Sequence, residues 1–173
     1  MNTRGQAFST FQLLIAAVVA LAILVLLLNI IGSLPNLGGQ KPNKVASDLV
    51  ASQVNSPAEL RTSTNVPFGK DDSLNAKSIA STSGVITEGQ ICLSLGDHAE
   101  ASGETGFHLQ GVNNNIITYD GSSSLRVKIS VLCDTGGQIQ TDLEDNGDYG
   151  GWTNDCTDLP PNQTACIVAL RFA

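Results

Sequence analysis

The hydrophobic residues of this chain are concentrated near its start and then become periodic. From Leu13 to Leu28 every residue is Leu, Ile, Ala or Val. The wider segment 7–31 has four polar residues, which are Ser9, Thr10, Gln12 and Asn29. At a rise of about 1.5 Å per residue, a helix over this segment would be roughly 37 Å long, which is enough to cross a bilayer. The pattern therefore predicts a long hydrophobic N-terminal helix.

The next part of the chain predicts a linker and two shorter helices. Glycine and proline are frequent between residues 32 and 43, as in a hinge or linker. Apolar residues then recur at helical spacing over 43–54, and Asn43 is a suitable residue to cap that amphipathic helix. A weaker helical pattern follows Asp72 and extends to about residue 81.

The rest of the chain has the pattern of a β-rich domain. Short runs rich in Val, Ile and Leu cover residues 89–95, 107–112, 115–119, 125–133 and 165–172. Alternation in the fourth run places Leu and Val toward a core and Arg126, Lys128 and Ser130 toward water. The segment 111–115 predicts a hairpin turn, because Gly and Asn tolerate the left-handed conformations of tight turns.

These elements together predict an α+β fold. A long hydrophobic N-terminal helix would precede a β-rich head, either an antiparallel sheet or a sandwich, in a lollipop-like molecule. The expected parts are a leader (1–5), the apolar helix (6–31), the linker (32–43) and the head (44–173). A chain of 173 residues has room for one compact domain besides such a helix.

Charge and composition exclude one class of partner. The formal net charge is −7, the basic residues are scattered singly, and aromatic residues make up 5% of the chain. A nucleic-acid interface needs a basic surface and often aromatic side chains on which bases stack. We therefore expect no nucleic acid among the partners.

The polar start of the chain indicates export. Arg4 and the N-terminal amine precede the apolar segment with no acidic residue nearby, which favours a cytoplasmic start and an outward-facing remainder. A typical secretory signal has a shorter apolar stretch followed by a small-residue cleavage site. Here the polar start ends in Arg4-Gly5 before the apolar stretch begins.

Arg4-Gly5-Gln6 followed by a long apolar helix resembles the class III signal peptide of archaeal type IV pilins. The resemblance covers residues 4–31. It implies that a prepilin peptidase cuts between Gly5 and Gln6, and that the subunit is held in the membrane before pilus assembly machinery adds it to a helical homopolymer. Thr10 stands where bacterial and many archaeal pilins have Glu as the fifth mature residue, so a contact from that Glu to a neighbouring amine is not implied.

The sequence therefore predicts a structural subunit of an extracellular type IV pilus-like filament rather than an enzyme. It would polymerise through the N-terminal helix, where Ala16 and Ala20 allow close helix approach, and display its head at the cell surface for contact or adhesion. No cofactor is expected. The alternative is a single-pass, membrane-anchored extracellular binding module, whose helix stays in lipid.

Four cysteines follow the apolar segment: Cys92, Cys133, Cys156 and Cys166. An even number in an exported domain predicts two disulfides in an oxidising compartment. Three pairings are possible. We favour one bond closing the proline-containing loop between the last two cysteines and another joining Cys92 to Cys133 in neighbouring strands. Zinc binding by these cysteines with His98 and His108 is the competing interpretation.

Three further groups of residues are candidate sites. The acidic segment 141–158 offers calcium ligands, namely Asp142, Glu144, Asn146 and Asp148, or it is a solvated acidic loop. Within it, Trp152 is either a surface anchor or packed on the core. Asn162-Gln163-Thr164 is an N-glycosylation sequon. The two histidines lie near Ser94, Asp97 and Ser102, but the chain has no Gly-x-Ser-x-Gly motif of a hydrolase.

Overall fold

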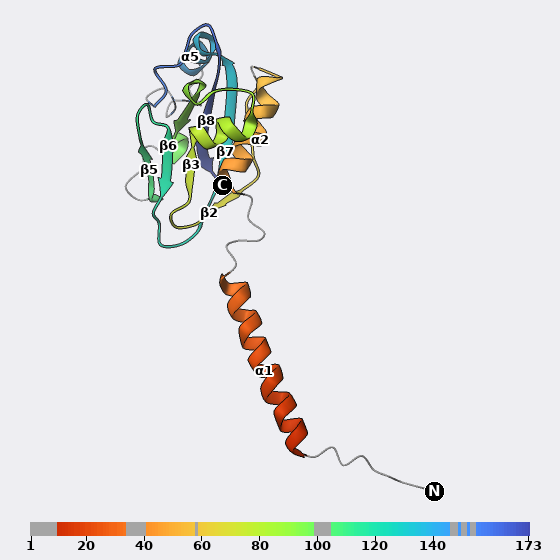
Figure 1. The fold of residues 1–173 in the computed structure, drawn as a ribbon. Coiled ribbons are helices and arrows are strands. Elements are labelled where there is room, and N and C mark those ends of the chain that lie inside the picture. The colour runs from red at the N-terminus through yellow and green to blue at the C-terminus, as the bar shows by residue number, and fades with distance from the viewer. Residues whose placement is uncertain are drawn as a thin grey trace. The chain divides into compact units, whose positions relative to one another are not determined.

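The structure, a computed structural model, describes residues 10–33, 41–57, 59–98, 105–145, 149, 152 and 155–173. The chain divides into two compact units, Met1–Gly38 and Gly39–Ala173. The first contains one described helix, and the second, which we call the head, contains all the described strands (Figure 1). The expected leader cleavage site at Gly5 and Gln6 lies outside the described residues.

Helix α1 covers Thr10–Ser33, and its described side chains are those of residues 14–25. Among the described residues, no helix is both long enough and apolar enough to cross a membrane. The expected lollipop-like fold with a long apolar membrane-crossing helix is therefore wrong in that feature, while a sheet-rich α+β head is present.

The head contains three α-helices among its described residues: α2 (Pro42–Val54), α3 (Ala76–Ser83) and α5 (Gly136–Asp145). Two short 3-10 helices, η1 (Glu88–Gln90) and η2 (Gly96–His98), flank a strand. The predicted amphipathic helix over 43–54 is confirmed as α2. The helix expected from Asp72 begins later, since residues 73–75 form a strand, and the sequence pattern did not predict α5.

The described strands of the head form two sheets. The larger sheet contains β1 (Arg61–Thr62), β2 (Val66–Phe68), β4 (Ile91–Ser94), β7 (Leu125–Thr135) and β8 (Thr164–Phe172). The smaller sheet contains β3 (Ser73–Asn75), β5 (Phe107–Gln110) and β6 (Ile116–Tyr119). All five predicted strand regions are therefore confirmed.

The larger sheet is mixed, which corrects the expected antiparallel arrangement. Its order is β1-β7-β8-β4, and β2 also pairs with β7. Strands β7 and β8 are antiparallel from Val127↔Phe172 to Thr135↔Thr164, whereas β4 runs parallel to β8. A parallel pair needs a long crossover connection, and here the chain between β4 and β8 forms β5, β6, β7 and α5. Such a long-range pairing leaves no local sequence signal.

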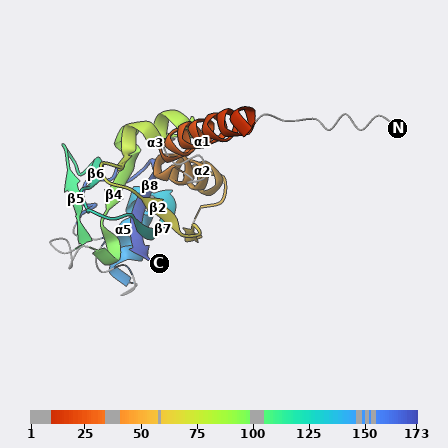
Figure 2. The ribbon, with the colours of Figure 1, turned by 90° about the horizontal axis from the view of Figure 1, so that it is seen from below.

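Strands β7 and β8 lie at the centre of a layered head. One face of the sheet packs in a core that includes Val50 of α2, Ile79 of α3 and Phe107 of the smaller sheet. The opposite face packs with Ile139 of α5 and with Trp152. Figure 2 shows α2 and α3 together on one side of these strands. Because both faces are covered, β8 is apolar almost throughout instead of alternating.

Two polar residues have roles that differ from those predicted. Ser130 is fully buried instead of facing water, and its hydroxyl lies 2.8 Å from the Thr62 hydroxyl. Helix α2 begins after Lys41, with Pro42 in its first turn, so Asn43 is not the cap. Asn43 instead accepts a hydrogen bond from the Asn75 backbone N–H (2.8 Å) and donates one to the Ser73 carbonyl (2.7 Å). It therefore joins α2 to β3.

Candidate functional site

The most unusual surface of the described chain is the apolar surface of helix α1. Eight large apolar side chains are between 47% and 61% exposed: Leu14, Ile15, Val18, Val19, Leu21, Ile23, Leu24 and Val25. All the residues from 14 to 25 are exposed, so the apolar surface covers the whole circumference of this segment. Helix α1 contains no charged residue. A surface of this kind is normally covered by a partner.

Covering these side chains would be strongly favourable. Complete burial of a Val, Leu or Ile side chain is worth about 1.5–3 kcal/mol. Since the α1 side chains are already about half covered by the helix itself, further burial would gain roughly 1 kcal/mol for each. Summed over eight residues, this is comparable with the whole stability of a small domain, about 5–15 kcal/mol. The surface is therefore suited to association and not to catalysis.

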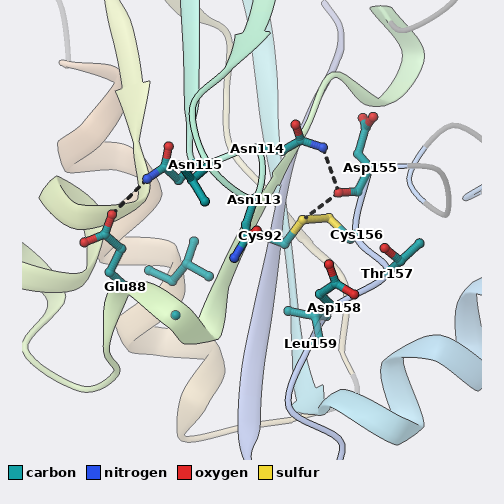
Figure 3. A pocket seen from close by; sticks show the side chains of 13 residues that line it. Glu88, Cys92, Asn113, Asn114, Asn115, Asp155, Cys156, Thr157, Asp158 and Leu159 are labelled. Carbon is teal, nitrogen blue, oxygen red and sulfur yellow. Dashed lines mark hydrogen bonds between the residues drawn. A yellow bond between two sulfur atoms is a disulfide. The ribbon is translucent and has the colours of Figure 1, made fainter.

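The head has a separate concave site, a cleft of about 430 Å³ beside the β5–β6 turn (Figure 3). Its floor includes Ile91 and Cys92, at the start of β4. Its walls come from η1, from the β5–β6 turn and from the segment after Asp155. The cleft thus brings together three segments that are far apart in the sequence.

The β5–β6 turn confirms the predicted hairpin and is hydrogen-bonded to the two other walls of the cleft. Gly111, Asn113 and Asn114 have positive φ values of 89°, 58° and 53°, the conformations that Gly and Asn tolerate best. The Asn114 amide donates to the Asp155 carbonyl (3.1 Å) and the Asn115 amide donates to the Glu88 carboxylate (3.0 Å). These hydrogen bonds, seen in Figure 3, join the turn to η1 and to the segment that begins at Asp155.

The chemistry of the cleft is acidic and amide-rich. Glu88, Asp155 and Asp158 are among its lining residues, and no Lys, Arg or His is. The Asp155 carboxylate is already occupied, because it accepts hydrogen bonds from the Ser94 hydroxyl (2.9 Å) and the Leu95 N–H (3.1 Å). Val112, at the tip of the turn, is 81% exposed. The cleft can offer hydrogen bonds to a polar ligand, but its lining has no activated nucleophile.

The four cysteines form two disulfides, but in a pairing different from the favoured one. Cys92 is bonded to Cys156, and Cys133 is bonded to Cys166. The register of β7 and β8 places Cys133 directly opposite Cys166, with Cα atoms 4.1 Å apart. The favoured pairing assumes that the strands of Cys92 and Cys133 are neighbours, whereas β8 lies between β4 and β7 in the sheet. Because every cysteine is in a disulfide, the zinc alternative is wrong.

The two histidines lie in different environments. His98 is 2% exposed, and its ring packs against Phe107 and Phe172. Burial lowers the pKa of His98, against smaller raising effects from the Arg171 backbone and the Asp97 charge. His108 is exposed and contacts Asp120 at 3.0 Å. Ser102 lies outside the described residues.

The other residues that a Ser-His-Asp hydrolase site would use have structural partners. Asp97 contacts the Arg171 guanidinium at 3.3 Å, and the Ser94 hydroxyl donates to Asp155. The buried His98 ring contacts two aromatic rings. These residues cap the ends of β4 and β8, so the geometry gives no support to a Ser-His-Asp arrangement.

The candidate calcium ligands are only partly described. Asp142 and Glu144 lie on α5, where Asp142 accepts a hydrogen bond from Gln138 (2.9 Å), one helical turn away. Asn146 and Asp148 lie outside the described residues. Within the part of the chain that the structure describes, no group of three or more His, Cys, Asp or Glu side chains could hold a metal ion.

The remaining candidates are both placed by the structure. Trp152 is 1% exposed and belongs to the core beneath α5, which confirms the core interpretation. Asn162 is exposed on the loop before β8. The cleft was not predicted as a site. Its only sequence signal was the Gly-Asn-rich turn, because the other two walls contact this turn through hydrogen bonds between residues far apart in the sequence.

Comparisons of the chain with protein-family models, with curated proteins and with solved structures find no match. The class that the described residues define is therefore an α+β head with a mixed sheet and two disulfides, preceded by a helix with an uncovered apolar surface.

Proposed function

We propose that this chain is the structural subunit of an extracellular type IV pilus-like filament, and that the apolar surface of α1 packs against α1 helices of other copies. The observation that carries this proposal is the exposure of eight large apolar side chains between residues 14 and 25. A hydrophobic surface of that extent needs a cover, and within the described head the apolar core is already buried.

A second copy of α1 is a suitable cover for three reasons. The helix has no charge, so identical helices do not repel one another. Ala16 and Ala20 are spaced as a small-xxx-small pair, which permits close helix approach. Moreover, every residue of α1 from 14 to 25 is exposed, so that partner helices can pack on any side of this segment.

The N-terminal motif and the disulfides agree with this role. Arg4-Gly5-Gln6 has the form of a prepilin cleavage site, which implies a mature subunit starting at Gln6. Two disulfides fit a head that works in an oxidising environment outside the cell. The role is assembly and surface contact, with the head displayed outside the cell.

Isolation of surface filaments from the source cells tests the proposal. We expect peptide mapping to find this chain as a filament component whose first residue is Gln6, unmodified or cyclised to pyroglutamate. Recovery only as a membrane-bound monomer that still begins at Met1 would overturn the proposal. That result would favour the anchored binding module instead.

A further inference from the structure

The loop that enters β8 presents an asparagine in a form suited to covalent modification. Asn162 and Gln163 are exposed, and Thr164 is half-buried at the first position of β8. Within the described part of the chain, neither the Asn162 amide nor the Thr164 hydroxyl makes a hydrogen bond. The Asn162 side chain is therefore accessible to an enzyme, and within the described residues the Thr164 hydroxyl is not engaged elsewhere.

The backbone around Asn162 is firmly held, although its side chain is free. The Gly136 N–H donates to the Gln163 carbonyl and the Gly137 N–H donates to the Pro161 carbonyl, both at 3.1 Å. Thr164 pairs with Thr135 of β7. These contacts fix the backbone of the loop against the start of α5, while Asn162 remains exposed.

A substituent on Asn162 would disturb nothing that holds the head together. The three residues before it in the chain, Leu159 to Pro161, make their contacts through buried Leu159 and through backbone carbonyls. The Cys133–Cys166 disulfide lies two residues inside β8 from Thr164 and is fully buried. A large polar group can therefore extend into solvent without displacing the core.

We propose that Asn162 is the acceptor of an N-linked oligosaccharide. The glycan is transferred from a lipid-linked oligosaccharide, the co-reactant of this chemistry. A bond forms between Asn162 Nδ2 and the anomeric carbon of the first sugar, while the bond from that carbon to the lipid phosphate oxygen breaks. Nδ2 loses one proton, the lipid phosphate leaves, and nothing is oxidised or reduced. The residue between Asn162 and Thr164 is glutamine, which satisfies the requirement that it is not proline.

Mass spectrometry of the full chain recovered from the surface of its own cells tests this site. After reduction and alkylation, cleavage before aspartate releases residues 158–173, which contain Asn162 as their one asparagine. We expect this peptide to have the added mass of a glycan, with fragment ions that place it on Asn162. An unmodified peptide from the surface-exposed chain would overturn the proposal.

Three variants separate sequon-dependent glycosylation from other additions. Thr164→Val keeps Asn162 and a β-branched residue at the start of β8, yet it should abolish the added mass, whereas Thr164→Ser should retain it. Asn65→Gln, a change at an exposed asparagine outside any sequon, should leave the mass of the 158–173 peptide unchanged. An added mass that persists in Thr164→Val would overturn the proposal. The peptide is read whether or not the chain is in filaments, so the result is independent of the proposed assembly.

Discussion

Helix α1 and strand β8 have similarly apolar sequences and opposite surroundings. In β8 every residue from Ala165 to Leu170 is fully buried, whereas in α1 every residue from 14 to 25 is exposed. Strand β8 is covered by its own chain, because β7 and β4 flank it and helices or the smaller sheet cover both faces. Among the described residues of its own unit, helix α1 has no such cover. Hydrophobicity alone therefore does not tell whether the cover is internal or comes from a partner.

The largest expected effect comes from placing a charge on α1. Leu24→Lys should abolish filaments, because an unpaired ammonium buried between helices costs several kcal/mol. Val112→Lys is the matched control: Val112 is even more exposed than Leu24, at 81% against 52%, but lies on the head. Electron microscopy should show filaments with Val112→Lys and none with Leu24→Lys. Loss of filaments in both variants would contradict the claim that assembly depends on the surface of α1 and not on the head.

Removal of either disulfide should destabilise the head. The Cys92–Cys156 and Cys133–Cys166 bonds join residues 64 and 33 positions apart. Loop entropy gives each a contribution of about 4 kcal/mol, with the longer loop ahead by roughly half a kcal/mol. Urea denaturation of the two double Cys→Ser variants would measure these differences. An unchanged free energy of unfolding in either variant would show that its disulfide does not constrain the unfolded chain.

Asn43 should contribute more to stability than another asparagine at the opposite end of α2. Asn43→Ala leaves the Asn75 N–H and the Ser73 carbonyl without their partner, at a cost of about 1–3 kcal/mol. Asn55 makes an exposed hydrogen bond to the Ala51 carbonyl (2.9 Å), so Asn55→Ala should change stability by less than about 0.5 kcal/mol. Denaturation curves of the two variants should differ accordingly. Equal losses would contradict the bridging role of Asn43.

The smallest expected effect is a pH dependence of the head. Since burial lowers the pKa of His98 in the folded state, the unfolded chain binds a proton more readily as pH falls below about 6.5. The free energy of unfolding should therefore be highest above that pH and decrease below it. His98→Phe, which keeps a ring between Phe107 and Phe172, should reduce this dependence. Identical pH profiles of the two proteins would exclude His98 as its source.

The sequence predicted the local elements of the head better than their pairing. Five of the eight described strands, helix α2 and the turn at 111–115 followed from periodicity and from Gly and Asn, whereas β1, β2 and β3 were not predicted. The parallel pairing of β4 with β8, the disulfide connectivity and the burial of Ser130 depend on segments distant in sequence. Helix α5 was missed because its acidic residues resembled a solvated loop. The cleft could not be predicted, since its walls meet only after both sheets have formed.

The central claim is that the assembly surface lies on α1 and not on the head. Sedimentation velocity of a chain beginning at Lys41, compared with the mature full chain, tests it most directly. We predict a folded monomer for the head, whose eight basic and sixteen acidic residues leave a net charge of −8, and polymers for the mature chain. Stable oligomers or filaments formed by the head alone would contradict the account.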